Sequence, residues 1–308
     1  MAYNLSYNKN IDHSLLEVTP INNKNTHILY HYLHTAYKYC KANPIQVNIT
    51  PVDVQKLTRQ IQSQGASYFP LVIKSELIRT MKYKISFCFK YKKRVVNVNF
   101  YEKQKPNVGV FSKKVRMICM WFYIMTAYTK SKFAENLTID LYMSDHKKIL
   151  PKKGDIISYI NVNSGFSLLS AMNGHIVIYR REEWFKVLIH ECFHALGLDF
   201  STLNGDLLND LNHSLNTSFS IDTQLRIYET YTEFWAEIMN VAFVAFDTLH
   251  DKQNARLFGL YWEGYMYIEK VHSLTMMVKI LDFLGFSYED FCNPKMHAKI
   301  RKRFKQKT

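Results

Sequence analysis

The hydrophobic period of the chain changes near residue 83, and this change constrains the fold most strongly. From Tyr83 to Phe89 apolar residues alternate with polar ones, and the same alternation returns from Val96 to Phe100. A two-residue period is typical of strands that bury one face. The basic pair Lys92 and Lys93 separates the two stretches. We therefore predict a β-hairpin at this point of the chain.

Helical and strand patterns surround this hairpin in an order that indicates an α+β fold. Further strand candidates are 137–143, 155–160 and 174–179. Apolar spacing and length predict helices at 26–40, 52–64, 113–128, 182–196, 221–246 and 252–284. Gly197 is well placed to stop one helix in a left-handed conformation, whereas 198–220 is polar and is predicted to be turn-rich. A mixed sheet with one crossover helix thus precedes a mainly helical C-terminal half.

The chain is long enough for a sizeable core, since it has 308 residues of which 47% are hydrophobic. No long linker rich in proline, glycine or serine marks a domain boundary. The predicted segments are an N-terminal helical segment 1–80, a sheet-bearing segment 81–200, a helical segment 201–292 and a basic tail 293–308.

Positive charge is concentrated in two parts of the chain. Residues 79–132 contain fourteen lysines and arginines but one acid, and residues 295–307 contain seven and no acid. Blocks of one sign are typical of proteins that bind a polyanion, so a nucleic acid or another polyanion, such as an anionic surface, is the expected partner. The alternatives are that these runs are solvated faces, or that the tail is a nuclear-localisation signal.

The cysteines and the lack of an apolar segment long enough for a signal peptide or a membrane span indicate a reducing, intracellular compartment. The five cysteines are scattered and form no CxxC pair, which fits reduced thiols better than a disulfide framework. Residues 1–10 lack the apolar region of a secretory signal. The most apolar run, 117–125, is shorter than the roughly 18 residues of a membrane span. We expect a cytoplasmic or nuclear protein without a membrane span.

The most informative motif is HExxH, formed by His190, Glu191 and His194. On a helix the two histidines lie on one face, one turn apart, and can both reach one tetrahedral zinc ion. Glu191 would lie beside the open coordination position and could act as general base. A chance match is expected only about 0.02 times in such a chain. The alternative is two helix histidines with ordinary surface or core roles.

A catalytic zinc ion normally has a third protein ligand, and the downstream helix offers Glu229, Glu233 and Glu237 at four-residue spacing. The apolar run 241–246 indicates that this helix is buried, so its carboxylates need partners. We expect Glu233 to be the third ligand, with Glu229 as an alternative. Glu237 is expected to accept a hydrogen bond from a zinc-binding histidine. A solvent-facing acidic stripe is the competing interpretation.

These two helices resemble the zincin metallopeptidases and, within them, the gluzincin pattern. The resemblance rests on HExxH and on the string Glu233-Phe-Trp-Ala-Glu237, and it covers about half of the chain, 95–246. It implies a zincin upper subdomain at 81–200 and a helical lower subdomain at 201–292. It also implies a zinc-dependent metalloendopeptidase with one Zn²⁺ per chain, bound by His190, His194 and Glu233. Glu191 would then be the general base and acid.

The resemblance further implies that a peptide or protein substrate lies along an edge strand of the sheet. The expected strand consists of Gly174, His175, Ile176, Val177, Ile178 and Tyr179. The whole string from 163–166 through 179–185 to the HExxH motif is also similar to predicted metallopeptidases of large DNA viruses, which implies a viral and virion-associated protein. The alternative function is a non-catalytic basic scaffold or nucleic-acid-packaging protein that retains a zincin fold.

Several residues depart from the family pattern or leave a role open. Gly197 fits the longer metzincin motif, but Phe200 replaces its last histidine and Asp199 lies one residue short of an aspartate ligand. Asp199 is therefore kept as an alternative ligand, with a turn or capping role preferred. His213 is a further alternative ligand, as in zincins that digest DNA-crosslinked proteins.

Other residues near the motif have expected roles apart from metal binding. Cys192 is expected in the core. Candidates for stabilising the transition state are Tyr228, Tyr231, His213 and His272.

Overall fold

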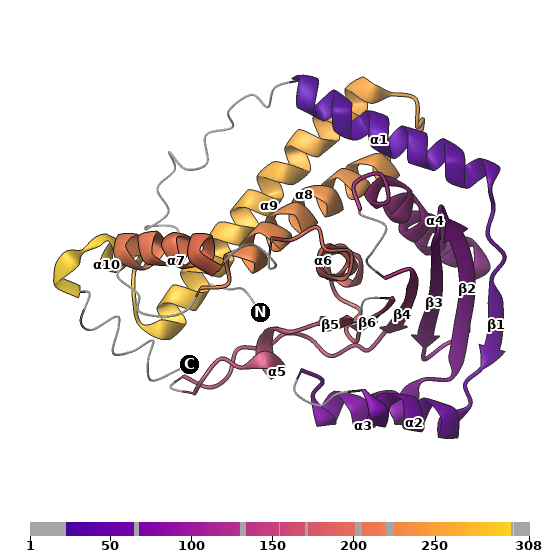
Figure 1. Ribbon diagram of the computed structural model, residues 1–308, viewed down its shortest axis with the longest axis horizontal. Coiled ribbons are helices and arrows are strands. Elements are labelled where there is room, and N and C mark those ends of the chain that lie inside the picture. Colours follow the sequence, from indigo (N-terminus) through magenta and orange to yellow (C-terminus); the bar gives the residue numbers. More distant parts are fainter. Residues whose placement is uncertain are drawn as a thin grey trace, which may run out of the picture.

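The protein has an α+β architecture, as predicted, with one mixed sheet and helices on both of its faces (Figure 1). The computed structural model describes residues 23–64, 68–129, 134–153, 155–169, 172–200, 205–219, 225–296 and 298. Its strands are β1 (Asn48–Pro51), β2 (Tyr83–Tyr91), β3 (Arg94–Glu102), β4 (Asn136–Tyr142), β5 (Gly165–Leu169) and β6 (Asn173–Ile178). Its helices are α1 (Asn23–Ala42), α2 (Val54–Ser63), α3 (Leu71–Thr80), α4 (Val108–Met125), α5 (Tyr159–Val162), α6 (Trp184–Ala195), α7 (Gly205–Phe219), α8 (Ile227–Thr248), α9 (Ala255–Leu284) and α10 (Tyr288–Cys292).

The strand order is β1-β2-β3-β4-β6-β5. The predicted hairpin is present, because β2 and β3 pair antiparallel around Lys92, which has a φ of 52°. The crossover helix α4 then leads to β4, which is parallel to β3. Strand β6 continues the parallel part of the sheet, and β5 pairs antiparallel with β6 at the edge.

Two cores hold helices against the two faces of the sheet. The larger core lies between the sheet and helices α1, α4, α6, α8 and α9, and it includes Val98, Ile139 and Ile176 from neighbouring strands. The smaller core joins α2 and α3 to the opposite face through Phe69, which stacks on Tyr179. Burial of these alternate residues is the physical reason for the two-residue period in the sequence.

Several elements differ from the sequence-based prediction. The segment 155–160 is not a strand, since its last residues begin the short helix α5. Most of the stretch predicted as turn-rich forms the helix α7. The strands β1 and β5 and the helices α3 and α10 were not predicted at all. Strands of four or five residues carry too little alternation to be recognised, because their pairing partners define them.

The N-terminal segment is joined to the rest of the fold in two ways. Strand β1 pairs with β2, from Asn48 opposite Ser86 to Pro51 opposite Tyr83. Helix α1 packs against α4 and α9, and Leu33 of α1 is completely buried. The first segment therefore contributes to the sheet and to the main core.

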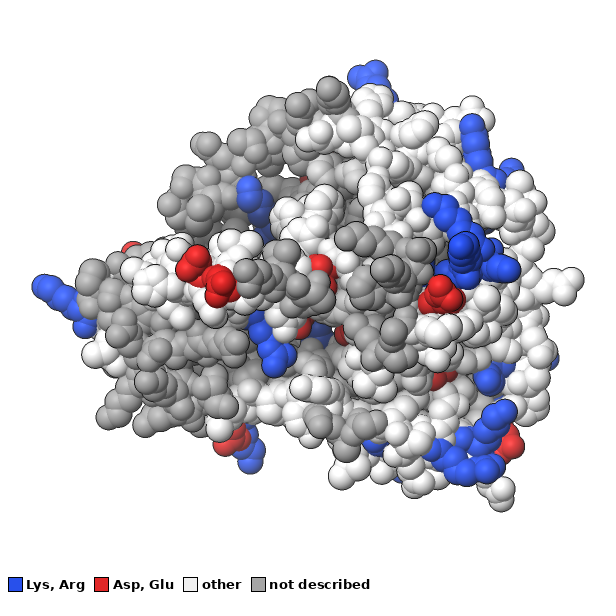
Figure 2. Space-filling model, viewed as in Figure 1, with Lys and Arg blue, Asp and Glu red and all other residues white. Residues whose placement is uncertain are grey.

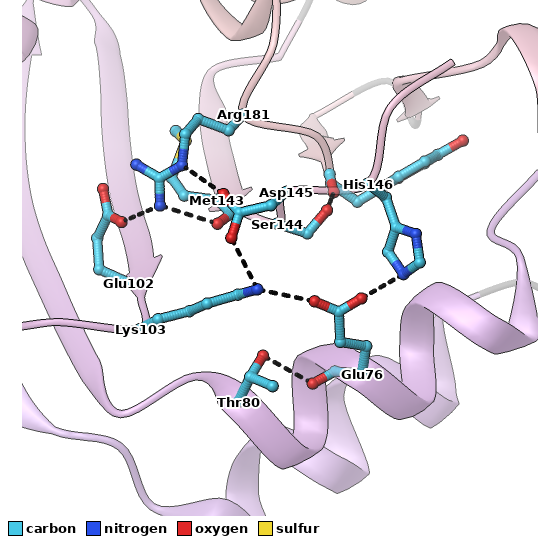
Figure 3. Close-up of polar contacts among 10 residues, drawn as sticks. Glu76, Thr80, Glu102, Lys103, Met143, Ser144, Asp145, His146 and Arg181 are labelled. Carbon is cyan, nitrogen blue, oxygen red and sulfur yellow. Dashed lines mark hydrogen bonds and ion pairs between the residues drawn. The ribbon is translucent and has the colours of Figure 1, made fainter. Parts of the chain in front are cut away.

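An ion-pair network fixes the connection between β6 and α6 (Figure 3). Arg181, in this connection, donates to Glu102 at the end of β3 over 2.8 Å and to Asp145 over 3.2 Å. Lys103 bridges Asp145 and Glu76 of α3 at 2.9 and 2.8 Å. The start of α6 is thus attached to α3, to β3 and to the loop after β4.

Candidate metal centre

Helix α6 presents its polar face to α8 and buries its other face. Leu188, Ile189 and Cys192 have no exposed surface, which confirms that Cys192 is a core residue. The helix ends at Ala195, and Gly197 follows its C-cap with a left-handed φ of 61°, as predicted for a helix stop. This orientation leaves His190 and His194 facing the first turn of α8.

Three potential ligand atoms converge between these helices. The Nε2 atoms of His190 and His194 are 3.1 Å apart, and Oε2 of Glu229 is 3.2 Å from each of them. Ligands at the usual zinc distances of about 2.0–2.1 Å, arranged tetrahedrally, are separated by about 3.3–3.4 Å. The spacing and chemistry of the three atoms therefore fit one tetrahedral zinc ion.

The other ring nitrogen of each histidine faces a carboxylate. Nδ1 of His190 is 3.0 Å from Oε2 of Glu233, and Nδ1 of His194 is 2.6 Å from Oδ2 of Asp199. Each Nδ1 can donate its N–H to the carboxylate, which leaves Nε2, the nitrogen that faces Glu229, as the atom that could bind a metal. Asp199 thus orients His194 in this structure. Its carboxylate oxygens do not belong to the group of three converging ligand atoms.

The glutamates that contact the histidines differ from the predicted ones by one helical turn. Glu229, the alternative, has its carboxylate beside both Nε2 atoms, whereas Glu233 makes the contact with a histidine that was expected of Glu237. The reason is that α8 begins at Ile227 and meets the two histidines with its first turn. Glu237 forms no hydrogen bond with a histidine of the described chain, and burial raises its pKa.

Charge within the site changes the protonation of the histidines. Burial alone would lower the pKa of both rings, but hydrogen bonds to the surrounding carboxylates outweigh it. The pKa of His190 is raised to about 9 by Glu229 and Glu233, and that of His194 to about 10 by Asp199 and Glu229. The same contacts hold the pKa of Glu229 well below its usual range. This concentration of negative charge favours a bound cation.

Glu191 lies beside the converging atoms and is only 8% exposed. Burial raises the pKa of its carboxyl, and this effect is opposed by the neighbouring histidines and by a hydrogen bond from Ser167 of β5. A buried carboxylate with a raised pKa is suited to accept and return a proton.

The site opens into a cavity of about 780 Å³. Gly165, Phe166 and Ser167 of β5 line one side, and α6 and the first turn of α8 line the other. Here the structure corrects the predicted edge strand, because β6 lies between β4 and β5 and is paired on both sides. The edge strand at the cavity is β5, which the sequence pattern did not reveal.

The remaining candidates lie at varied distances from the converging atoms. Tyr228 lines the cavity, with its ring centroid 6.2 Å from that of His194. Tyr231 packs against Phe193 and Phe200. His213 is exposed on α7, and His272 lies 3.6 Å from Glu269 on α9. Among the described residues, neither histidine joins the group formed by His190, His194 and Glu229.

Sequence reasoning missed Lys186, which lies one turn before His190. Its Nζ is 2.6 Å from Oε1 of Glu233, and its side chain is 15% exposed. The available signal was the four-residue spacing between Lys186 and His190 on the polar face of the HExxH helix.

Lysines and arginines fall in several separate groups on the face of the molecule shown in Figure 2. The basic segment predicted at 79–132 contributes side chains both to the surface and to contacts within the fold. Some are used inside the fold through hydrogen bonds or ion pairs, namely Lys92, Arg94, Lys103 and Lys114. Lys130, Lys132 and the tail from residue 299 lie outside the described residues. Binding of a nucleic acid stays a prediction.

Comparison with protein-family models, curated proteins and solved structures gives no match to this chain. Within the described ranges, no helix has both the length and the apolar character that a membrane span requires.

Proposed function

We propose that this protein is a zinc-dependent metalloendopeptidase with a zincin-like arrangement of sheet and helices. The observation that carries the proposal is the convergence of His190, His194 and Glu229 at 3.1–3.2 Å beside the buried Glu191. Two imidazoles and a carboxylate are a ligand set of catalytic zinc in peptidases. The cavity between β5 and α8 provides room for a peptide.

Each residue of the site has a distinct task in this proposal. His190, His194 and Glu229 would hold the zinc ion, which supplies Lewis acidity toward a water molecule and a peptide carbonyl. Glu191 takes a proton from the attacking water and returns it to the leaving amine. Glu233 and Asp199 orient the two imidazoles through their Nδ1 atoms.

Strand β5 supplies the backbone that would align a substrate. It has a neighbour on one side only among the described strands, and it borders the cavity. An extended peptide could pair with its free edge, as in other cases of strand addition. This role replaces the one first predicted for 174–179.

Glu191→Gln tests the catalytic role directly. We expect this variant to lose at least about 100-fold in the rate of hydrolysis of a mixed peptide library, followed by mass spectrometry. Its zinc content should equal that of the wild type, because Glu191 is not one of the converging ligands. Full activity in the variant would refute this mechanism. Zinc binding by a wild type that hydrolyses no peptide would favour the scaffold function instead.

A further inference from the structure

Lys186 has no role in the proposed hydrolysis, yet its side chain lies within the site. It projects from α6 one turn before His190 and lines the cavity. Its Nζ lies 2.6 Å from Oε1 of Glu233, whose other oxygen faces Nδ1 of His190 at 3.0 Å. Lys186, Glu233 and His190 therefore form one chain of polar contacts.

We infer that Lys186 is a positioning residue that keeps Glu233 on Nδ1 of His190 and so leaves Glu229 as the acidic metal ligand. This inference rests on the proposed zinc site. It adds a physical reason why one of two similar glutamates binds the metal and the other does not.

The choice between the glutamates needs such a reason because both can reach His190. Glu229 and Glu233 are one turn apart on the same face of α8, and their carboxylates lie 3.2 and 3.0 Å from the two nitrogens of this ring. Without further constraint, either carboxylate could turn toward the metal. A metal site with two competing acids would have mixed coordination.

Lys186 removes this ambiguity by engaging the second oxygen of Glu233. Both oxygens of Glu233 are then committed, one to an ammonium group and one to an imidazole N–H. Among the described residues, the carboxylate of Glu229 forms no ion pair with a lysine or arginine, so its charge is left for the metal. An ammonium group cannot itself replace a metal ligand, because it has no lone pair.

A second lysine in the same cavity wall provides a matched control. Lys148 lines the cavity but pairs with Glu183 at 2.8 Å rather than with Glu233. Lys148→Met therefore removes one positive charge from the cavity without removing a hydrogen-bond partner of Lys186, Glu233 or His190. Lys186→Met removes the ammonium group and retains a long side chain, while Lys186→Arg retains the charge.

The test is titration of the metal-free full-length variants with Co²⁺, followed by the visible absorption of the bound ion and by competition with Zn²⁺. We expect Lys186→Met to alter the cobalt spectrum and to weaken binding by about 10- to 100-fold. Lys186→Arg should restore the wild-type spectrum, and Lys148→Met should leave both properties unchanged. Glu233→Gln should resemble Lys186→Met, and the double variant should be no worse than Glu233→Gln alone.

A wild-type spectrum and affinity in folded Lys186→Met would overturn the inference while leaving the zinc site intact. Equal losses in Lys186→Met and Lys148→Met would also overturn it, because they would show a general effect of cavity charge. A wild type that binds neither Co²⁺ nor Zn²⁺ would refute the proposed function itself. Circular dichroism of each variant separates these outcomes from misfolding, and Glu233→Gln tests the same contact chain if Lys186→Met does not fold.

Discussion

The two histidines of the site are oriented by acids that bind the ring nitrogens away from the proposed metal. For His194 this acid is Asp199, whose carboxylate is buried and 2.6 Å from Nδ1. Such contacts fix the tautomer and raise the basicity of the ligand. The exposed His213 on α7 has no comparable contact with the site among the described residues.

Asp199→Ala should therefore weaken zinc binding by about 10- to 100-fold, since His194 loses the acceptor that orients it. Competition with a chromogenic chelator measures this affinity. His213→Ala serves as the control and should bind zinc like the wild type. Loss of zinc in His213→Ala, together with normal binding by Asp199→Ala, would move the third ligand to α7.

The raised pKa values of His190 and His194 predict how zinc binding depends on pH. With pKa values of about 9 and 10, both rings carry a second proton at pH 7 in the metal-free protein, and zinc must displace both protons. The apparent affinity should rise about 100-fold per pH unit from about pH 7 to 8.5. Isothermal titration in buffers of different ionisation enthalpy measures the released protons. An apparent zinc affinity that stops rising just above pH 7 would contradict the raised pKa values of the two histidines.

The same shifts affect the stability of the metal-free protein. A histidine whose pKa is raised on folding stabilises the folded state fully below its unfolded value of about 6.5, and this contribution is lost as the pH rises through about 9–10. The lowered pKa of Glu229 affects stability at acidic pH. Its contribution to the stability of the folded state is fully present above about pH 4.5 and is lost on acidification. The metal-free protein should therefore be most stable between these limits, near pH 5–6.5, as thermal unfolding across pH can show.

Among the helices and strands, the sequence predicted those whose formation depends on residues close together in the chain. Helix α6 and its stop at Gly197 follow from apolar spacing and from the conformational freedom of glycine. The choice between Glu229 and Glu233 could not be predicted, because both lie on one face of α8. The packing of α8 against α6 brings both glutamates to the histidines, and no local pattern in the sequence specifies this packing. Strand β5 was missed for a similar reason, since its pairing with β6 defines it.

The ion-pair network before α6 should contribute measurably to stability. Glu102 is 7% exposed and pairs with both Lys114 and Arg181. Removing a buried partner of an ion pair costs about 3–5 kcal/mol, and the partial exposure of Arg181 reduces this to about 2–3 kcal/mol for Glu102→Ala. Urea unfolding should show a lower midpoint with an unchanged slope.

An exposed ion pair provides the control for this prediction. Asp247 lies 3.6 Å from Lys113, and both side chains are about half exposed. Asp247→Ala should lower the free energy of unfolding by less than about 1 kcal/mol. Equal effects of the two substitutions would show that the network of Glu102 does not fix the start of α6.

At the scale of the whole molecule, the site is assembled from segments that are distant in the sequence. Strand β5 lies at the edge of the sheet, α6 carries the histidines, and α8 from the helical half closes the cavity (Figure 1). The α+β class and the HExxH helix were predictable because each depends on a strong local pattern. The cavity was not, because it depends on how the helical half meets the sheet edge.

In the proposed site, His190, His194 and Glu229 together hold one zinc ion. The most direct test of this site is the metal content of the protein by elemental mass spectrometry after reconstitution with zinc and desalting. Glu229→Ala and Glu233→Ala form a matched pair on one helix. We predict one zinc per chain in the wild type and in Glu233→Ala, and none in Glu229→Ala. Zinc retained in Glu229→Ala, or absent from the reconstituted wild type, would show that these three residues do not form the zinc site.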